Sequence, residues 1–335
     1  MTELFSNLNP KIFSDIKDIE QTPIRKGFGE GLLIAGEKNK NIVGLCADLT
    51  ESTQMNLFRD RFPDRFIEIG VAEQNLASVA SGMAAMGKIP AMTSYAMFSP
   101  GRNWEQIRTT ICYNDRKVII AGSHAGVSVG PDGGTHQAIE DIALMRIIPN
   151  MTVISPCDAI EARKATIAAF EVGQKTPVYI RLAREKTPVI TTEETPFVIG
   201  KANVLYESSL GVSVERKFNT LICATGALVY HALLAAKELE NKYGQKVAVI
   251  NFHTIKPLDT QTLFSYVELS DKILTVEEHQ IAGGFGSAIC EAVSDKYAKI
   301  IHRIGVNDKF GQSGTPAELI KFYNMDVADI VKKAV

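Results

Sequence analysis

The sequence predicts an α/β protein with two doubly wound domains, each built on a mostly parallel β-sheet with helices on both faces. Short runs rich in Val and Ile alternate with helical runs along nearly the whole chain, which is the order of elements that a parallel sheet requires. The alternation loosens once, over residues 186–217, where threonines and prolines interrupt it. The chain has 335 residues, which is long enough for two hydrophobic cores.

We divide the chain into an N-terminal arm at residues 1–20, a larger domain at 21–190 and a smaller domain at 191–335. The arm mixes charged and apolar residues, so we expect it to dock as a short amphipathic segment and not to act as a signal peptide. The stretch 186–217 is expected to form a linker followed by an edge hairpin.

Each predicted strand of the larger domain is a short run rich in β-branched residues, and each helix a longer run with apolar residues at helical spacing. The expected strands are 41–48, 65–70, 89–92, 117–124, 152–156 and 177–183. The expected helices are 26–38, 53–62, 72–86, 101–113 and 158–171. In the third helix Leu76, Val79, Met83 and Met86 recur at helical spacing, which predicts an apolar face.

The smaller domain repeats the alternation. Its expected strands are 219–226, 246–254, 272–278 and 300–306, and its expected helices are 227–244 and a helix that starts at 284. The stretch GGFGSA (283–288) follows a strand and opens a helix, but it does not fit the dinucleotide-binding spacing GxGxxG. We interpret it as glycines that pack a helix start.

Composition excludes several classes of protein. The formal net charge of −2 gives no basic surface for nucleic acid, and no apolar run is long enough to cross a bilayer. The five cysteines are scattered without a CxxC pair, which is typical of the reducing cytoplasm. Histidines and cysteines show no metal-binding spacing, so we expect no metal site in this chain.

The stretch 123–151 follows a predicted strand and is the most informative part of the sequence. Its glycines allow the backbone to approach a ligand closely, and we expect a helix to start near Gln137. His124 and His136 flank Asp132, a combination that can bind hydroxyl groups or move protons. The alternative is a glycine-rich connector whose histidines bond only to the backbone. Two histidines with an aspartate favour the functional interpretation.

Glu73 stands at the start of a predicted helix among small and apolar residues. An acid in a first helical turn is favoured by the helix dipole and needs no other role. An apolar environment would instead raise the pKa of this carboxyl, as in sites where it must donate a hydrogen bond. The sequence leaves both interpretations open. Tyr95 and Phe98 could line the pocket of a flat ring, or they could be core aromatics.

Arg25, Ser52 and Arg184 each lie next to the end of a predicted strand or helix. Arg184 follows the strand 177–183, so it should lie at the carboxyl edge of the sheet, where a guanidinium can bind a phosphate. The alternative for each arginine is an ordinary solvated side chain.

Several blocks of the sequence, taken in order, resemble the transketolase family. They are ADLTES (47–52), EIGVAEQN (68–75), the aromatic pair in SYAMFS, the block DGGTHQAIEDIALMRIIPNM and VNDKFGQSGTPAEL (306–319). The resemblance implies a pyrimidine-binding domain of thiamine-diphosphate enzymes followed by the smaller transketolase C-terminal domain. The family's other large domain, with its Gly-Asp-Gly…Asn motif for magnesium and diphosphate, has no match here.

The resemblance also implies roles for single residues. Glu73 matches the acid that bonds to N1′ of the aminopyrimidine ring of thiamine diphosphate and sets its tautomer. Tyr95 and Phe98 match residues that pack on that ring, and Asp48 matches an acid close to the cofactor. His136 matches a histidine near the reacting carbonyl, and Asp132 matches a residue that binds a substrate hydroxyl. The positions that match the substrate-phosphate site are Arg25, Ser52, His124 and Arg184.

The implied function is the small subunit of a two-chain transketolase, which moves a two-carbon ketol unit from a ketose phosphate to an aldose. A partner with the diphosphate-binding domain would hold Mg²⁺ or Ca²⁺, and two chains of each kind would form an A2B2 heterotetramer. The donor sugar stays open between xylulose 5-phosphate, a branched sugar phosphate and a sulfonated sugar. We assign the smaller domain to assembly.

Three alternatives remain. The chain could be the β-type subunit of a 2-oxo-acid dehydrogenase, half of an enzyme like deoxyxylulose-phosphate synthase, or a regulatory subunit that kept the fold and lost the site. The block at residues 132–151, together with Arg25 and Arg184, favours a sugar-phosphate enzyme over a 2-oxo-acid dehydrogenase subunit. A regulatory subunit that lost the site is disfavoured, because the sequence retains Glu73, His124, Asp132 and His136.

Overall fold

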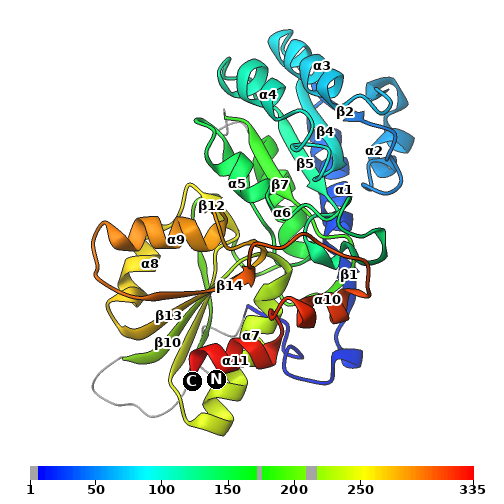
Figure 1. Cartoon of the computed structure of the whole chain (residues 1–335). Helices are drawn as coiled ribbons and strands as arrows, with labels where there is room; N and C mark the ends of the chain where they lie inside the picture. Colours follow the sequence, from blue (N-terminus) through cyan, green and yellow to red (C-terminus); the bar gives the residue numbers. More distant parts are fainter. Residues whose placement is uncertain (1–6, 172–175, 209–216) are drawn as a thin grey trace.

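Two α/β units lie side by side in the computed structural model, which describes residues 7–171, 176–208 and 217–335 (Figure 1). Each unit has its own largely parallel sheet. The predicted fold class is therefore confirmed. In the described part of the chain, no helix combines the length and the apolar character needed to cross a membrane.

The larger sheet has seven strands in the order β12-β6-β7-β5-β4-β2-β3. Its strands are β2 (Ile42–Cys46), β3 (Phe66–Glu68), β4 (Ile89–Tyr95), β5 (Ile119–Ser123), β6 (Thr152–Ile154), β7 (Val178–Arg181) and β12 (Thr254–Lys256). The pairs are parallel apart from β12 with β6, which is antiparallel. Since β12 comes from the C-terminal half of the chain, that half completes the sheet of the first unit.

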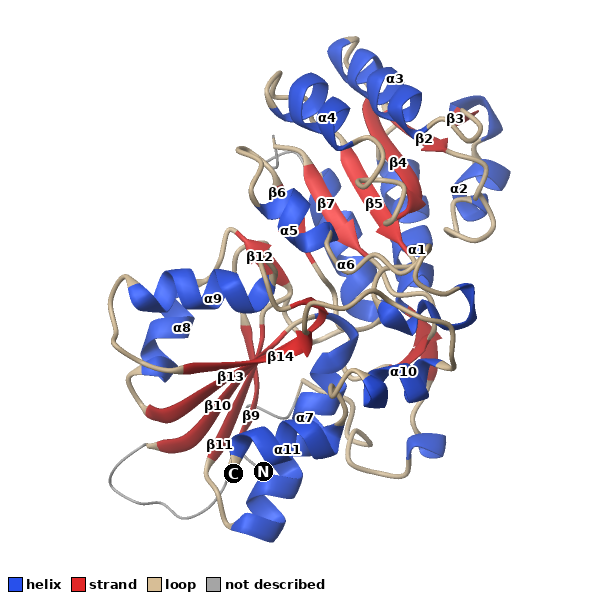
Figure 2. Ribbon diagram, viewed as in Figure 1, coloured by secondary structure: helices blue, strands red, loops and turns tan. Residues whose placement is uncertain are grey.

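Helices lie on both faces of this sheet, as Figure 2 shows. They are α1 (Ile24–Lys38), α2 (Asn56–Arg61), α3 (Glu73–Ala85), α4 (Trp104–Gln106), α5 (Asp141–Arg146) and α6 (Ala159–Phe170). Helix α1 packs closely on α6, because Gly27 and Gly31 present no side chain where the backbone of α6 passes. The expected apolar face of α3 is only partly right, since Leu76 is fully buried but Met86 is 84% exposed.

The smaller sheet has five strands in the order β14-β13-β10-β11-β9. These are β9 (Asn203–Glu207), β10 (Phe218–Ala224), β11 (Val247–Asn251), β13 (Ser270–Gln280) and β14 (Ile301–Val306). The surrounding helices are α7 (Val229–Tyr243), α8 (Thr260–Val267), α9 (Phe285–Ser294), α10 (Pro316–Phe322) and α11 (Val327–Ala334). Part of the expected edge hairpin, 209–216, lies outside the described residues. Of the described residues in this stretch, β9 forms the edge of the smaller sheet and pairs antiparallel with β11, and the hairpin stays a prediction.

Two further expectations about the larger domain need correction. The single helix at 101–113 is in fact the short α4 followed by a π-helical turn at Ile107–Cys112. The helix after the glycine-rich stretch begins at Asp141 and not near Gln137. The backbone before Asp141 cannot be helical, because the carbonyls of Ala138 and Ile139 accept hydrogen bonds from Gly126 and Gln280.

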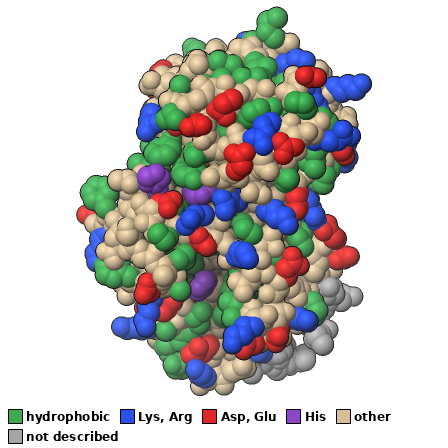
Figure 3. Space-filling model, turned by 90° about the vertical axis from the view of Figure 1, so that its right-hand side faces the viewer, with side chains coloured by type: hydrophobic (Ala, Val, Ile, Leu, Met, Phe, Trp, Pro, Cys, Tyr) green, Lys and Arg blue, Asp and Glu red, His purple; other side chains and the backbone are tan. Residues whose placement is uncertain are grey.

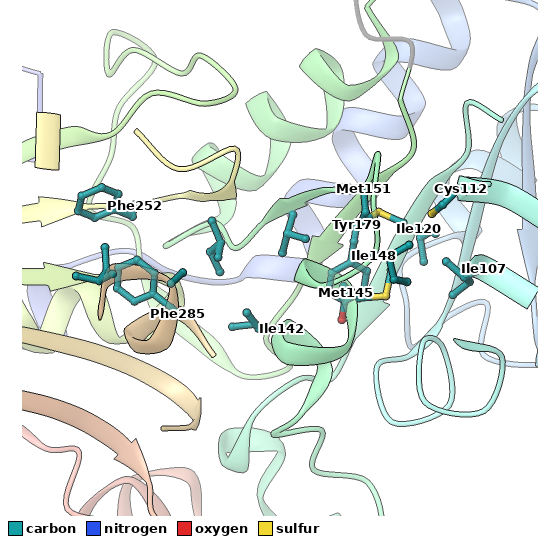
Figure 4. Close-up of a cluster of buried hydrophobic side chains, with 14 of the residues drawn as sticks. Ile107, Cys112, Ile120, Ile142, Met145, Ile148, Met151, Tyr179, Phe252 and Phe285 are labelled. Atoms are coloured by element: carbon teal, nitrogen blue, oxygen red, sulfur yellow. The ribbon is translucent and has the colours of Figure 1, made fainter. Parts of the chain in front are cut away.

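One cluster of buried apolar side chains extends from one unit into the other. In Figure 4 it runs from Phe252 and Phe285 of the C-terminal half, past Ile142, to Met145 and Tyr179 of the first unit. The two units therefore share part of their cores.

The N-terminal arm is docked, as expected, over the residues that the structure describes. Leu8 and Ile12 are buried against the second unit, and Leu8 forms a bridge with Thr191. After the arm, β1 (Gln21–Pro23) pairs antiparallel with β8 (Lys186–Pro188).

Candidate active site

Most of the residues singled out in the sequence lie at the carboxyl edge of the larger sheet. Tyr95 is the last residue of β4, His124 directly follows β5, and Arg184 lies just beyond β7. Because these strands are parallel neighbours, their carboxyl ends meet at one edge, where ligands bind in open α/β sheets. Figure 3 shows Lys, Arg and His side chains gathered on the band between the two units.

Four rings form the centre of the candidate site. The rings of Tyr95 and His124 stack with centroids 3.8 Å apart, and Phe98 lies nearly parallel to Tyr95 at 6.0 Å. The ring of His136 stands edge-on to both aromatics, 6.2 Å from Tyr95 and 5.5 Å from Phe98. The structure therefore brings together two histidines and two aromatics that are up to 41 positions apart in the sequence (95 to 136).

Cationic groups surround His124 on the other side. Arg25 Nη1 donates a hydrogen bond to the carbonyl of Ser52 at 2.5 Å and lies 3.5 Å from Nε2 of His124. Arg184 Nη1 donates to the carbonyl of Val129 at 2.7 Å. Burial and the nearby charge of Arg184 lower the pKa of Arg25. Positive charge concentrated in a partly buried place is typical of a site for an anion.

His124 is neutral at ordinary pH. Burial, and then the charges of Arg25 and Arg184, lower its pKa to about 3. Its Nδ1 lies 2.9 Å from the hydroxyl of Ser123, and its backbone has a φ of 57°. A positive φ is uncommon for a residue other than glycine, and such strained residues tend to cluster at functional sites. A neutral imidazole here can donate one hydrogen bond to an anion while the arginines supply the charge.

Glu73 is the first residue of α3, and its side chain is 1% exposed. Its carboxylate oxygen Oε2 accepts a hydrogen bond from Arg102 Nη1 at 2.7 Å, and its backbone carbonyl accepts one from the Asn103 amide at 2.9 Å. The expected apolar surroundings are therefore wrong in one respect, because a guanidinium contacts the buried carboxylate. Arg102 also lies 4.8 Å from the ring centroid of Phe98.

Arg102 was missed in the sequence, since it follows Gly101 at an irregular helix start and belongs to no recognisable pattern. Its side chain is 50% exposed and covers the buried carboxylate of Glu73. It also lines a cavity of about 600 Å³ together with Phe98, Thr135, Glu140 and other residues. A cavity of this size next to an aromatic ring suits a small heterocycle.

Two predicted site residues lie apart from this cluster. Asp48 and Asp132 are both exposed, on loops at the same edge of the sheet. The backbone N–H of Asp48 donates to Oε1 of Glu68 at 2.7 Å. Among the hydrogen bonds of the described residues, none links either aspartate side chain to the ring cluster. Their expected contacts with cofactor and substrate stay predictions.

The glycines of the stretch after β5 pack closely against the C-terminal unit. A Cβ at Gly126 would lie 2.3 Å from Oε1 of Glu278, and one at Gly133 would lie 2.7 Å from the hydroxyl of Ser313. These glycines bring the backbone close to the C-terminal unit, and their expected approach to a ligand stays a prediction.

The stretch at 283–288 is a helix start, as interpreted. The carboxylate of Glu277 accepts hydrogen bonds from the backbone N–H groups of Phe285 and Gly286, at 2.6 and 2.7 Å, at the first turn of α9. Burial raises the pKa of Glu277 to about 7. In the part of the chain that the structure covers, no cluster of three or more His, Cys, Asp or Glu side chains could hold a metal ion.

Comparisons with known proteins agree with this architecture. Residues 20–189 match the family model "Transketolase, pyrimidine binding domain", and residues 211–330 match "Transketolase, C-terminal domain". A protein of Methanocaldococcus jannaschii, named for a transketolase C-terminal section, is 42% identical, with 92% of this chain and 94% of that protein covered. A 6-deoxy-6-sulfo-D-fructose transketolase subunit of Clostridium sp. strain MSTE9 is 35% identical, with 94% of each chain covered.

Longer relatives contain this chain as one half. The 1-deoxy-D-xylulose-5-phosphate synthase of Desulfitobacterium hafniense is 34% identical over 92% of this chain but only 47% of its own length. Among solved structures, a split-gene transketolase described as an inactive beta4 tetramer superimposes with a TM-score of 0.83 at 39% identity, with 93% of this chain and 97% of that chain covered.

Proposed function

The chain belongs to the transketolase family, and from this premise we propose that it is the small subunit of a two-chain transketolase. It would transfer a two-carbon ketol unit from an anionic ketose to an aldose, and only together with a partner that carries the diphosphate-binding domain. The observation that carries the proposal is one arrangement at the sheet edge. The buried carboxylate of Glu73 contacts Arg102, which lies over the ring of Phe98, and Arg25 lies beside the neutral His124, which stacks on Tyr95.

The residues present fit the pyrimidine part of thiamine diphosphate. The carboxyl of Glu73 is buried and contacts Arg102, which lines the cavity of about 600 Å³, and the ring of Phe98 forms part of the cavity wall. A flat heterocycle can pack on that ring while a nitrogen at its edge meets the carboxyl group. When bound, the cofactor supplies the nucleophilic carbon of ketol transfer.

Glu73 would hold a proton at the pyrimidine nitrogen. For this, Arg102 must move from the carboxylate, and its half-exposed side chain leaves room for that movement. The displaced charge would leave a buried carboxyl whose favoured partner is a ring nitrogen. Tyr95 and Phe98 would fix the plane of the ring. His136, edge-on to both, would donate or accept a proton at an oxygen of the substrate.

The substrate class follows from charge. Arg25, Arg184, the neutral His124 and the Ser52 segment would bind a tetrahedral anion at the far end of the sugar, and the exposed Asp132 would bond to a hydroxyl group. Relatives are named for different sugars, 6-deoxy-6-sulfo-D-fructose in one case and apulose 4-phosphate in a 33% identical protein of Phocaeicola vulgatus. Phosphate and sulfonate both suit this group of cations.

A partner subunit would complete the site and hold the diphosphate through Mg²⁺ or Ca²⁺. Support comes from the similarity to a transketolase C-terminal section and to a split-gene transketolase, and from large apolar side chains that are exposed around α3. Val71 is 70% exposed, Met86 84% and Tyr113 81%, and exposed apolar side chains of this size are suited to contact another protein. Asp48 would lie near the cofactor at that contact. We propose an A2B2 heterotetramer and a cytoplasmic location, the latter supported by five free cysteines.

Reconstitution tests the proposal. The isolated chain should show no ketol transfer from a ketose phosphate, and addition of a purified partner with the Gly-Asp-Gly motif should produce it. Activity with pyruvate in place of the ketose would favour a 2-oxo-acid dehydrogenase subunit. Calorimetry that detects no thiamine diphosphate binding by the assembled pair would favour a regulatory subunit. Full activity of the isolated chain would overturn the split-enzyme proposal.

A further inference from the structure

The loop that carries both site histidines lies directly on the second unit. We call residues 124–137 the substrate loop. The backbone N–H of Ser128 in this loop donates a hydrogen bond to Oε1 of Glu278 in β13, at 2.5 Å. Glu278 is 4% exposed. Its backbone carbonyl in turn accepts from Nη2 of Arg181 at 2.8 Å. The contact is therefore fixed on both sides, since Arg181 belongs to the sheet of the first unit.

The backbone at Gly126 shows how close this contact is. Its φ is 89°, and a Cβ there would lie 2.3 Å from Oε1 of Glu278. The N–H of Gly126 donates to the carbonyl of Ala138 at 2.8 Å, which ties the beginning of the substrate loop to the residues that follow it. Gly126 therefore suits its position for two reasons, its conformation and the space it leaves for the carboxylate.

Gln137 fixes the other end of the loop. Its side chain is 1% exposed, and its Nε2 lies 3.0, 3.2 and 2.9 Å from the carbonyl oxygens of Val127, Gly130 and Gln312. A Cβ at Gly311 would lie 1.8 Å from Oε1 of Gln137. One buried amide thus bridges two points of the substrate loop to the segment that precedes α10.

These contacts stand next to the histidines of the site. His124 is two residues before Gly126, and His136 is the neighbour of Gln137. Both imidazoles pack within the four-ring cluster around Tyr95. A shift of the loop backbone would therefore move both rings relative to the substrate, and a displacement of about 1 Å can lower a rate by as much as 10²-fold.

We propose that Glu278 and Gln137 are positioning residues for ketol transfer, and that the C-terminal unit acts as a brace that holds the substrate loop in its reactive shape. This inference rests on the proposed function, because it assigns the loop a role in substrate binding. It gives the C-terminal unit a role in the reaction in addition to assembly. Among the hydrogen bonds of the described residues, none joins either side chain to the four rings, so each acts through the loop backbone.

Hydrogen exchange of the full isolated chain tests the brace without a measurement of enzyme activity. Glu278→Ala should increase amide exchange of peptides within 124–137 by about tenfold or more, since Ser128 loses its acceptor. Glu277→Ala is the matched control. It removes the adjacent buried carboxylate, which caps α9 at Phe285 and Gly286, so exchange should rise in α9 and not in the substrate loop. Equal exchange of the loop in both variants would overturn the proposal.

Kinetics of the reconstituted pair provide the second test. Glu278→Ala and Gln137→Met should each lower kcat/KM for the ketose phosphate by about tenfold to 10²-fold. The affinity for thiamine diphosphate should stay within threefold of wild type. Glu278→Gln, which keeps the acceptor oxygen, should recover most of the loss, and Glu277→Ala should stay within threefold of wild type.

The variants also separate the possible failures. If Glu278→Ala does not fold, Gln137→Met tests the same loop from its other end. An inactive wild-type pair would count against the proposed function, while hydrogen exchange would still decide the brace. An active pair in which both loop variants keep wild-type kcat/KM would refute the brace and leave the proposed function intact.

Discussion

Glu73 is the residue on which the proposed chemistry depends most, through its carboxyl group. In the reconstituted pair we expect Glu73→Ala to lower kcat by about 10²-fold or more, because a positioned acid contributes a factor of this size to proton transfer. Binding of thiamine diphosphate should weaken much less, since most of the contact would come from the rings and the partner. Steady-state kinetics and calorimetry measure the two effects.

Glu105→Ala is a suitable control for that variant. Glu105 is an exposed carboxylate in α4, one turn beyond Arg102, and lies outside the ring cluster. Its replacement should leave kcat unchanged. If Glu73→Ala retained wild-type turnover, the acid at the start of α3 would be an ordinary helix-dipole residue and its assigned role would be wrong.

Arg25 and its neighbour Lys26 offer a matched pair for the anion site. Arg25 is half-buried beside His124, while Lys26 is exposed and paired with Glu30 at 3.6 Å. Arg25→Gln should raise KM for a phosphorylated ketose by about tenfold to 10²-fold, from the ~1.5–3 kcal/mol of a charged hydrogen bond. Lys26→Gln should change little. With an unphosphorylated ketose the two variants should behave alike; a selective loss with Arg25→Gln there would exclude a phosphate contact.

The buried imidazole of His124 predicts a pH dependence of stability. Its pKa is about 3 in the folded chain, against an ordinary value of 6.5. Between these values the unfolded chain binds more protons, so the free energy of unfolding falls as pH falls. Relative to His124→Asn, whose side chain tolerates the positive φ, wild type should lose about 2 kcal/mol between pH 7 and 5. Urea unfolding measures this difference. If both proteins lost the same free energy of unfolding between pH 7 and 5, the buried neutral ring would be contradicted.

Helix packing positions Arg25, which is the second residue of α1. A Cβ at Gly27 would lie 1.9 Å from the carbonyl oxygen of Ala159 in α6, so Gly27→Ala must push the two helices apart. We expect a loss of about 1–3 kcal/mol in the free energy of unfolding. Gly82→Ala in α3, where nothing lies within 4 Å, should instead stabilise the isolated chain by about 0.5–1 kcal/mol. Urea unfolding would show opposite signs; a common sign would contradict this packing.

Elements with strong local patterns could be predicted from the sequence, and elements defined by distant contacts could not. The strands β2, β5 and β7 are short β-branched runs, and α1 and α6 have regular helical spacing. The pairing of β9 with β11 and the late start of α5 at Asp141 depend on hydrogen bonds to remote segments, which no local pattern records.

The candidate site divides in the same way. Because parallel strands end at one edge, the approximate position of Tyr95, His124 and Arg184 followed from the strand prediction. The contacts that shape the site could not be predicted from the sequence. Arg102 contacts Glu73 across 29 positions, and Glu278 contacts Ser128 across 150, from a strand of the other unit.

At the scale of the whole molecule, the two units are structurally joined. Strand β12 of the C-terminal half completes the larger sheet through β6, and the apolar cluster in Figure 4 continues across the junction. Buried polar contacts cross it as well. The Asn251 amide donates to Oε1 of Glu161 at 2.8 Å, and burial raises the pKa of that acid to about 7. The predicted boundary at 190/191 therefore separates two sequence patterns that share one core.

This junction predicts that the chain unfolds as a single cooperative unit. Calorimetry of the isolated chain should give one transition whose calorimetric and van't Hoff enthalpies agree. A fragment that ends at residue 190 should not reach a native fold, because it lacks β12 and leaves Ile142 and Glu161 without their partners from the other unit. Circular dichroism and urea unfolding of that fragment test the point. Two separate transitions in the whole chain, or a fragment that unfolds cooperatively by itself, would mean that the brace on the substrate loop can detach while the sheet that carries Glu73 stays folded.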